Sequence, residues 1–159
     1  MYLKMFLTLL IIVSISSCAT QRPDVKKSYI THAKKLTNGV KAQRDFQWIA
    51  KNADKLSKMG VDLINSFVSK NLQCKSFLNF VISKRVEMQH LAPEVIEVEY
   101  HEGKALPAHP ESCYELKEVI VHPATVFAIA NFKKNKLSRA DREQMVDEIE
   151  EVLAHVEVV

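Results

Sequence analysis

The sequence has few of the residues that break or reverse a chain. Its 159 residues include only three glycines and five prolines, and strand-joining turn dipeptides are almost absent apart from Asn38-Gly39. Few turns imply long elements, and apolar residues at helical spacing indicate that these elements are helices. We therefore predict an all-α fold, a single helical bundle of about five or six helices over residues 24–159.

Motifs of the common enzyme and cofactor classes are also missing. There is no Cys-x-x-Cys-His haem attachment, no His-Glu-x-x-His, no Gly-x-Ser-x-Gly and no phosphate-cradling glycine loop. We therefore predict a non-enzymatic protein and expect no cofactor. A hydrolytic enzyme is the least favoured reading, because no nucleophile and base can be placed together.

The first part of the chain lacks charge. Lys4 gives a short cationic start, and no charged side chain follows from Met5 to Gln21. The apolar core from Phe6 to Ile15 is roughly half of the 20 or so residues that a membrane-spanning helix needs. This pattern is typical of a signal peptide.

Ile15-Ser16-Ser17-Cys18 resembles the lipobox of bacterial lipoproteins, with an aliphatic residue and two small residues before a cysteine. The resemblance covers residues 1–18 only. It implies that residues 1–17 are a lipoprotein signal peptide and that Cys18 receives diacylglycerol and a further acyl chain such as palmitate. Residues 18–23 would then form a lipidated tether, because several acyl chains together hold a protein at a bilayer. An ordinary signal peptide or an uncleaved anchor is the alternative reading.

The residue after Cys18 is Ala19 and not Asp. In the sorting rule known for such lipoproteins, this favours the outer membrane, here on its periplasmic side. The expected partners are then the membrane itself and an envelope protein. Nucleic acid is not expected, because an exported protein does not meet it.

Three cysteines are present, and the lipoprotein reading assigns Cys18 to the lipid. Cys74 and Cys113 remain as a pair, which in an oxidising compartment predicts one disulfide. Two separate buried thiols are the alternative.

Charge is unevenly distributed along the chain. Residues 22–86 contain fourteen basic and four acidic residues, a net +10, and residues 87–159 contain seven basic and fifteen acidic residues, a net −8. One interpretation is that attraction between the two halves helps them pack together. Another is that the basic half, nearest the anchor, faces anionic lipid headgroups, where each Lys or Arg contributes about 1 kcal/mol.

Capping residues mark the predicted helix starts. Asp24 and Asp45 are placed to cap the first two helices, and Ser138 with Asp141 forms a capping pair before the last one. In that last helix the predicted inner stripe consists of Met145, Ile149, Val152 and Val156.

Glycine and proline mark the predicted ends and breaks. Asn38-Gly39 is expected to stop the first helix, and Gly60 is a candidate break in the second. We expect His122-Pro123 to interrupt the helix that starts near Leu116. Cys74 and Val86 are expected on the buried stripe of the third helix.

Residues 95–101 fit two patterns. Ile96, Val98 and Tyr100 alternate with polar residues as in a strand. Pro93 at a first helical turn and Gly103 just past the end favour a helix, which we prefer.

The most suggestive residues for chemistry are Glu97, His101, His109 and His122. In a helix, Glu97 and His101 share one face, so with His122 they form a candidate site for Zn or Cu. A surface ion pair is the plainer reading of Glu97 and His101. Aromatic pairs that could line a ligand cleft, or simply fill the core, are Phe46 with Trp48 and Tyr100 with Tyr114.

Two functional hypotheses follow. The first is a cell-envelope lipoprotein that docks a protein partner or stabilises an assembly. The second is a periplasmic lipoprotein that binds a metal or a small molecule through Glu97, His101 and His122.

Overall fold

The computed structural model describes residues 24–158, which form helices and turns with no strand among them. The longer helices are α1 (Val25–Lys41), α2 (Phe46–Val68), α3 (Lys75–Met88), α6 (Glu118–Lys133) and α7 (Arg139–Val158). The shorter ones are α4 (Pro93–Ile96), α5 (Glu111–Tyr114), η1 (Leu72–Cys74), η2 (Glu97–His101), η3 (Glu115–Lys117) and η4 (Lys134–Lys136). The all-α prediction is confirmed. The predicted signal peptide, residues 1–17, and the tether, residues 18–23, lie outside the described residues.

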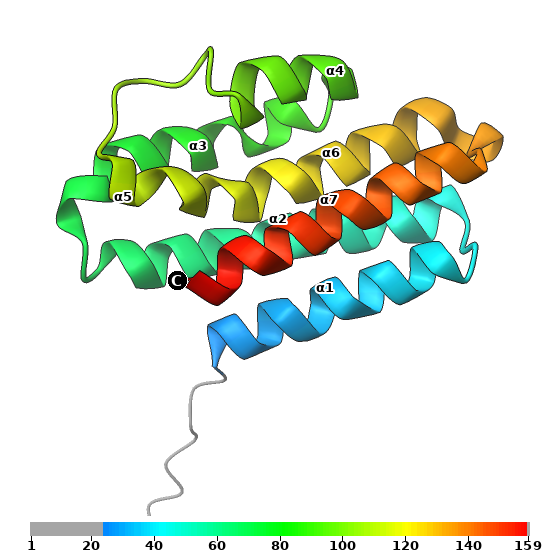
Figure 1. Cartoon of the computed structure of the whole chain (residues 1–159), viewed down its shortest axis with the longest axis horizontal. Helices are drawn as coiled ribbons and strands as arrows, with labels where there is room; N and C mark the ends of the chain where they lie inside the picture. The colour runs from blue at the N-terminus through cyan, green and yellow to red at the C-terminus, as the bar shows by residue number, and fades with distance from the viewer. Residues whose placement is uncertain (1–23, 159) are drawn as a thin grey trace, which may run out of the picture.

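Helix α6 runs through the middle of the bundle and packs along α2 (Figure 1). Helix α7 packs on α6 and on α1, while α3, α4 and η2 cover α6 on the side away from α1. Nearly every side chain of the first three turns of α6 is therefore buried. None of the described helices is long and apolar enough to cross a bilayer.

The predicted caps are present. The carboxylates of Asp24 and Asp45 each accept a hydrogen bond from the backbone N–H three residues later, at 3.1 and 2.8 Å. Before α7, the backbone N–H of Asp141 donates to Ser138 Oγ (3.1 Å), and the backbone N–H of Ser138 donates to Asp141 Oδ2 (2.7 Å). Each cap satisfies backbone donors that a helix start leaves unpaired, which contributes about 1 kcal/mol. The inner stripe predicted for α7 is buried as expected.

The disulfide between Cys74 and Cys113 is confirmed, with an S–S distance of 2.05 Å. It joins the segment before α3 to α5, and both cysteines are fully buried. One expectation for α3 was wrong, because Val86 is 53% exposed and not part of the buried stripe.

Two glycines predicted as a helix stop and a candidate break lie inside helices. Helix α1 continues through Gly39 to Lys41, and α2 continues through Gly60 without a break. A Cβ atom at Gly39 would lie 2.0 Å from the Trp48 ring, and one at Gly60 would lie 2.3 Å from the carbonyl oxygen of Val119. Both glycines therefore permit close approach of a neighbouring element.

Helix α6 also continues through Pro123, so the predicted interruption at His122-Pro123 was wrong. Proline has no N–H, and the carbonyl of Val119, four residues earlier, therefore has no intrahelical donor. The buried hydroxyl of Tyr29, on α1, donates to that carbonyl at 3.0 Å. A tertiary hydrogen bond thus replaces the missing helical one.

Candidate metal site

A π-helical turn positions His101. Residues 93–101 are helical, as preferred, with α4 leading directly into η2. The N–H of Glu102 donates to the carbonyl of Glu97 at 2.8 Å, which is the spacing of a π-turn. Gly103, at φ +87°, ends the element. Single π-turns of this kind occur frequently at functional sites.

The start of α6 supplies the other two members of the site. Glu118 and His122 lie one helical turn apart and therefore share a face. Both are almost completely buried, with 2% and 1% of their surface exposed. Because η2 packs against α6, His101 lies beside them.

One carboxylate oxygen lies between two imidazoles. Oε2 of Glu118 is 3.3 Å from Nδ1 of His101 and 3.6 Å from Nε2 of His122. One ligand atom from each residue can be chosen so that all three lie within 4.8 Å of one another. Zn²⁺ binds such atoms at about 2.0–2.2 Å in a tetrahedron, which places neighbouring ligand atoms about 3.3–3.6 Å apart. Two of the three separations already fit, and the third needs the imidazoles to approach each other.

A carboxylate on α7 orients the ring of His122 through Nδ1, the nitrogen that faces away from Glu118. Its Nδ1 lies 2.8 Å from Oε2 of Glu148, on α7. Its Nε2 is buried and has no hydrogen-bond partner among the described residues. A neutral His122 that donates from Nδ1 to this carboxylate presents a lone pair at Nε2, directed at the cluster. Metal-bound histidines are commonly held by a carboxylate in this way.

Lys117 balances the charge of Glu118. It is completely buried, its Nζ contacts Oε1 of Glu118, and it lies 3.9 Å from the centroid of the Tyr114 ring. Burial raises the pKa of Glu118, but hydrogen bonds and charge from His101 and Lys117 outweigh it and leave the pKa below its usual value. The hydrogen bond to Glu118 in turn raises the pKa of His101 to about 9.

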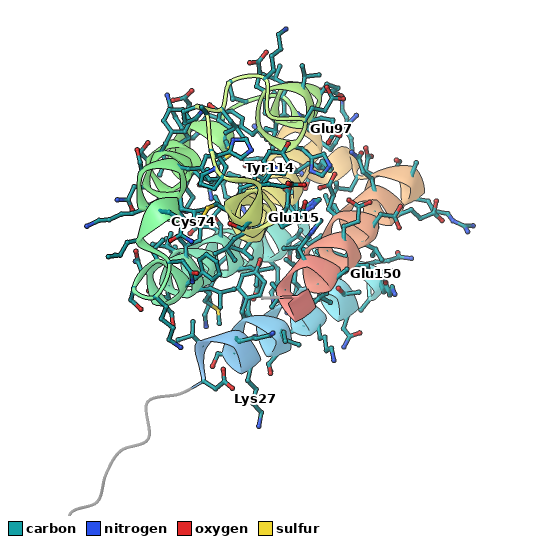
Figure 2. All side chains as sticks on the ribbon, turned by 60° about the vertical axis from the view of Figure 1, so that its left-hand side comes forward. Lys27, Cys74, Glu97, Tyr114, Glu115 and Glu150 are labelled. Carbon is teal, nitrogen blue, oxygen red and sulfur yellow. A yellow bond between two sulfur atoms is a disulfide. The ribbon has the colours of Figure 1, made fainter. Side chains whose placement is uncertain are left out.

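Exposed acids surround the site. Oε1 of Glu97 is 4.0 Å from Nε2 of His101, and Oε2 of Glu151 is 3.9 Å from Nε2 of His122. Glu115 lies 2.6 Å from Nδ1 of His155, whose ring stacks on that of His122. Figure 2 shows Glu97 and Glu115 beside Tyr114, well separated from Lys27 at the start of α1. These carboxylates give the region a negative potential that favours cations.

The structure brings together two of the residues predicted for metal binding, His101 and His122. The third, Glu97, lies at the margin of the site with half of its side chain exposed. His109 is elsewhere, and its ring stacks between Phe77 and Tyr114. The central carboxylate, Glu118, was not identified from the sequence. A signal for it was present, because Glu118 directly precedes the apolar run 119–121 and lies four residues before His122.

The aromatic pairs do not line a common cleft. Trp48 packs against Gly39, and the hydroxyl of Tyr100 donates to Glu87 at 3.0 Å. The hydroxyl of Tyr114 donates to the backbone carbonyl of His101 at 2.8 Å. Tyr114 therefore supports the candidate site by fixing the backbone that carries His101.

Comparison of the chain with protein-family models, with curated proteins and with solved structures finds no match. A fold alone does not define a function, whereas a set of side chains limits the chemistry that they can perform. Two imidazole nitrogens and one carboxylate oxygen are ligands that zinc and its neighbours prefer. Ca²⁺ and Mg²⁺ prefer sites made only of oxygen atoms.

Proposed function

We propose that the protein is a lipid-anchored envelope protein that binds a divalent transition-metal ion, Zn²⁺ in the first place, at His101, Glu118 and His122. The observation that carries the proposal is the unpaired Nε2 of His122, almost fully buried and 3.6 Å from Glu118. A buried polar atom without a partner is costly, and an ion at this position would satisfy it.

Each neighbour of the site has a role in this proposal. Glu148 holds the ring of His122, Tyr114 holds the backbone of His101, and Lys117 offsets the charge of Glu118. Glu151 or a water molecule supplies the fourth ligand, because three protein ligands leave one position of a tetrahedral zinc ion open. An open position allows the ion to exchange, which suits a carrier or a store of metal.

The proposed location rests on residues 15–18 and on the cysteine pair. A lipid on Cys18 would hold the protein at the periplasmic side of a membrane, with the outer membrane favoured by Ala19. The disulfide between Cys74 and Cys113 supports export, because such bonds persist in oxidising compartments. Metal binding is placed ahead of the docking of a protein partner because the buried cluster defines its ligand atoms, whereas exposed apolar side chains such as Val86 and Phe132 do not identify a partner.

The whole protein, extracted from membranes in detergent, serves for the test. We expect about one zinc per chain after dialysis against trace zinc, with the affinity measured by competition with a chromophoric chelator. Glu118→Gln and His122→Ala should each weaken zinc binding by more than about 100-fold, since even a lost outer partner costs 10–100-fold. His90→Ala, at an exposed histidine outside the site, is the matched control and should bind as the native protein does.

Glu118→Gln leaves Lys117 buried without its counter-charge, so circular dichroism must first show that the variant is folded. Should it unfold, Glu148→Gln replaces it, because that change removes only the group that orients His122. We expect it to weaken binding by about 10–100-fold. Native protein that retains no zinc, or variants that bind as tightly as the control, would refute the proposal.

The anchor is tested separately. Intact mass of the extracted protein, with and without reductant, reports acylation and the disulfide together. Cys18→Ser should abolish the acyl mass and release the protein from the membrane fraction. If the variant is matured and retained as the native chain is, the anchor and the envelope location are both wrong.

A further inference from the structure

The side of the bundle formed by α1 and α2 is rich in lysine. Helix α1 contains five lysines and no acidic residue. Five exposed lysines of the two helices form no ion pair with any acid in residues 24–158, namely Lys27, Lys34, Lys35, Lys51 and Lys55. Lysines that are left unpaired on one side create a positive potential.

Three of these lysines line one open groove between α1 and α2. Lys27, Lys35 and Lys55 line it together with Met59 and the buried His32. We call this the lysine groove. Its one acid, Asp24, is engaged as the cap of α1.

The environment of His32 supports a positive potential in the lysine groove. Burial lowers the pKa of His32, and the charges of Lys55 and Lys35 lower it further. A hydrogen bond to the carbonyl of Asn52 raises this pKa but does not outweigh the other effects. The charges of the two lysines therefore disfavour a further positive charge in the lysine groove and favour a bound anion.

The lysine groove lies at the N-terminal end of α1, next to the proposed anchor. Even fully extended, residues 18–24 span at most about 25 Å, at roughly 3.3–3.6 Å per residue. A lipid on Cys18 would therefore hold this end of α1 close to the headgroups. The acidic metal site lies elsewhere, as Figure 2 shows by the separation of Lys27 from Glu97 and Glu115.

We infer that the lysine groove and its two flanking lysines, Lys34 and Lys51, bind the phosphates of anionic phospholipids, so that the α1–α2 side lies on the membrane. The inference rests on the proposed anchor for the location of the groove and on the lysines themselves for the chemistry. The metal site then faces away from the bilayer, where anionic headgroups do not compete with Glu97 and Glu151 for the ion.

The full protein is reconstituted into nanodiscs of phosphatidylcholine alone or with phosphatidylglycerol, and lysine acetylation rates are read by mass spectrometry. The five lysines should react at least threefold more slowly in the anionic discs, and high salt should remove the difference. Lys104, 72% exposed and outside α1 and α2, is the internal control and should react equally in both.

A charge-reversal pair sharpens the test. Lys35→Glu with Lys55→Glu should abolish the protection of the remaining lysines, whereas Lys104→Glu with Lys136→Glu makes the same change of net charge and should preserve it.

Vesicle sedimentation distinguishes binding through the anchor from binding through the lysine groove. An unacylated protein that sediments only with anionic vesicles supports the groove without the anchor. Protein retained in both kinds of disc with equally reactive lysines, or protein that binds neither kind of vesicle, overturns the inference.

Discussion

Replacing Tyr29 by phenylalanine tests why α6 continues unbroken through Pro123. The Tyr29 hydroxyl donates to the carbonyl of Val119 at 3.0 Å, and the proline leaves that carbonyl without a helical donor. Burial, with a smaller contribution from Glu118, raises the pKa of Tyr29 well above its ordinary value, so the hydroxyl keeps its proton at neutral pH. Phenylalanine keeps the ring and removes the donor. A buried carbonyl left unsatisfied costs about 1–3 kcal/mol.

Pro123→Ala supplies the comparison background. Alanine returns a backbone N–H to position 123, which gives the Val119 carbonyl a donor within α6. In that background Tyr29→Phe removes one of two hydrogen bonds and should cost only about 0.5–1.5 kcal/mol. The two changes should therefore be coupled by about 1 kcal/mol, which a double-mutant cycle isolates.

The assay is urea unfolding of the native protein, the two single variants and the double variant, followed by circular dichroism with the disulfide intact. The free energy of unfolding is extrapolated linearly to water. Tyr100→Phe is the matched control, because its ring is also buried but its hydroxyl donates to Glu87 on α3. That change should show no coupling to Pro123→Ala. If Tyr29→Phe costs the same in both backgrounds, Tyr29 does not compensate for the proline and the explanation of α6 is wrong.

Gly60→Ala should destabilise the protein although alanine is the better helix former, because its Cβ would lie 2.3 Å from the Val119 carbonyl oxygen. We expect a loss of about 1–3 kcal/mol in the free energy of unfolding, measured with urea. Reducing the Cys74–Cys113 disulfide, which spans a sequence separation of 39, should lower that free energy by about 4 kcal/mol on the chain-entropy model, seen as a lower urea midpoint. Burial raises the pKa of Asp54, but hydrogen bonds from three side chains outweigh it and leave the pKa below 3.8. Its contribution to stability is therefore present above pH 3.8 and lost as the pH falls through the folded value, so Asp54→Asn should flatten the acid limb of a stability–pH curve.

Each of these predictions has a control within the chain. Ser66→Ala, at an exposed position of α2, changes helix propensity alone and should stay within about 0.5 kcal/mol of the native protein. A Cys74→Ser, Cys113→Ser double variant should not respond to reductant. Asp62→Asn, at an exposed position of the same helix, makes the same change of charge without removing these hydrogen bonds and is the control for Asp54→Asn. A stabilising Gly60→Ala, or an unaltered acid limb in Asp54→Asn, would contradict the corresponding contact.

Local patterns predicted the helices well, because the interactions that begin a helix are local. The caps at Asp24, Asp45 and Ser138 each join residues three apart, and a stripe of apolar residues repeats within one helix. The disulfide followed from the number of cysteines once Cys18 was set aside for lipid. Pro93 and Gly103 distinguished a helix from a strand for the residues between them.

The errors arose where the decisive partner is distant in the sequence. Gly39 was expected to end the first helix and Gly60 was only a candidate break, because glycine weakens a helix, but each makes room for a neighbouring element. Pro123 was expected to break α6, and the compensating donor, Tyr29, lies 90 residues from the carbonyl that it satisfies. No local pattern contains that information.

For the site, the sequence indicated two of three central residues. Glu97 and His101 attracted attention because they are four residues apart, yet the carboxylate between the imidazoles comes from Glu118 on another element. A charged residue beside an apolar run is a stronger signal than an exposed pair, because burial of a charge requires a partner.

The placement of the ionic cluster on α6 connects the fold to the proposed function. Lys117, Glu118 and His122 occupy the helix with the most buried surroundings, where the cost of removing charge from water often exceeds the gain from pairing. Apolar side chains of similar volume would fill this space at least as well. A contribution to stability therefore does not explain the cluster. The proposed binding of a cation would explain it, because the same burial would strengthen the attraction of an ion to Glu118, and Nε2 of His122 has no hydrogen-bond partner among residues 24–158.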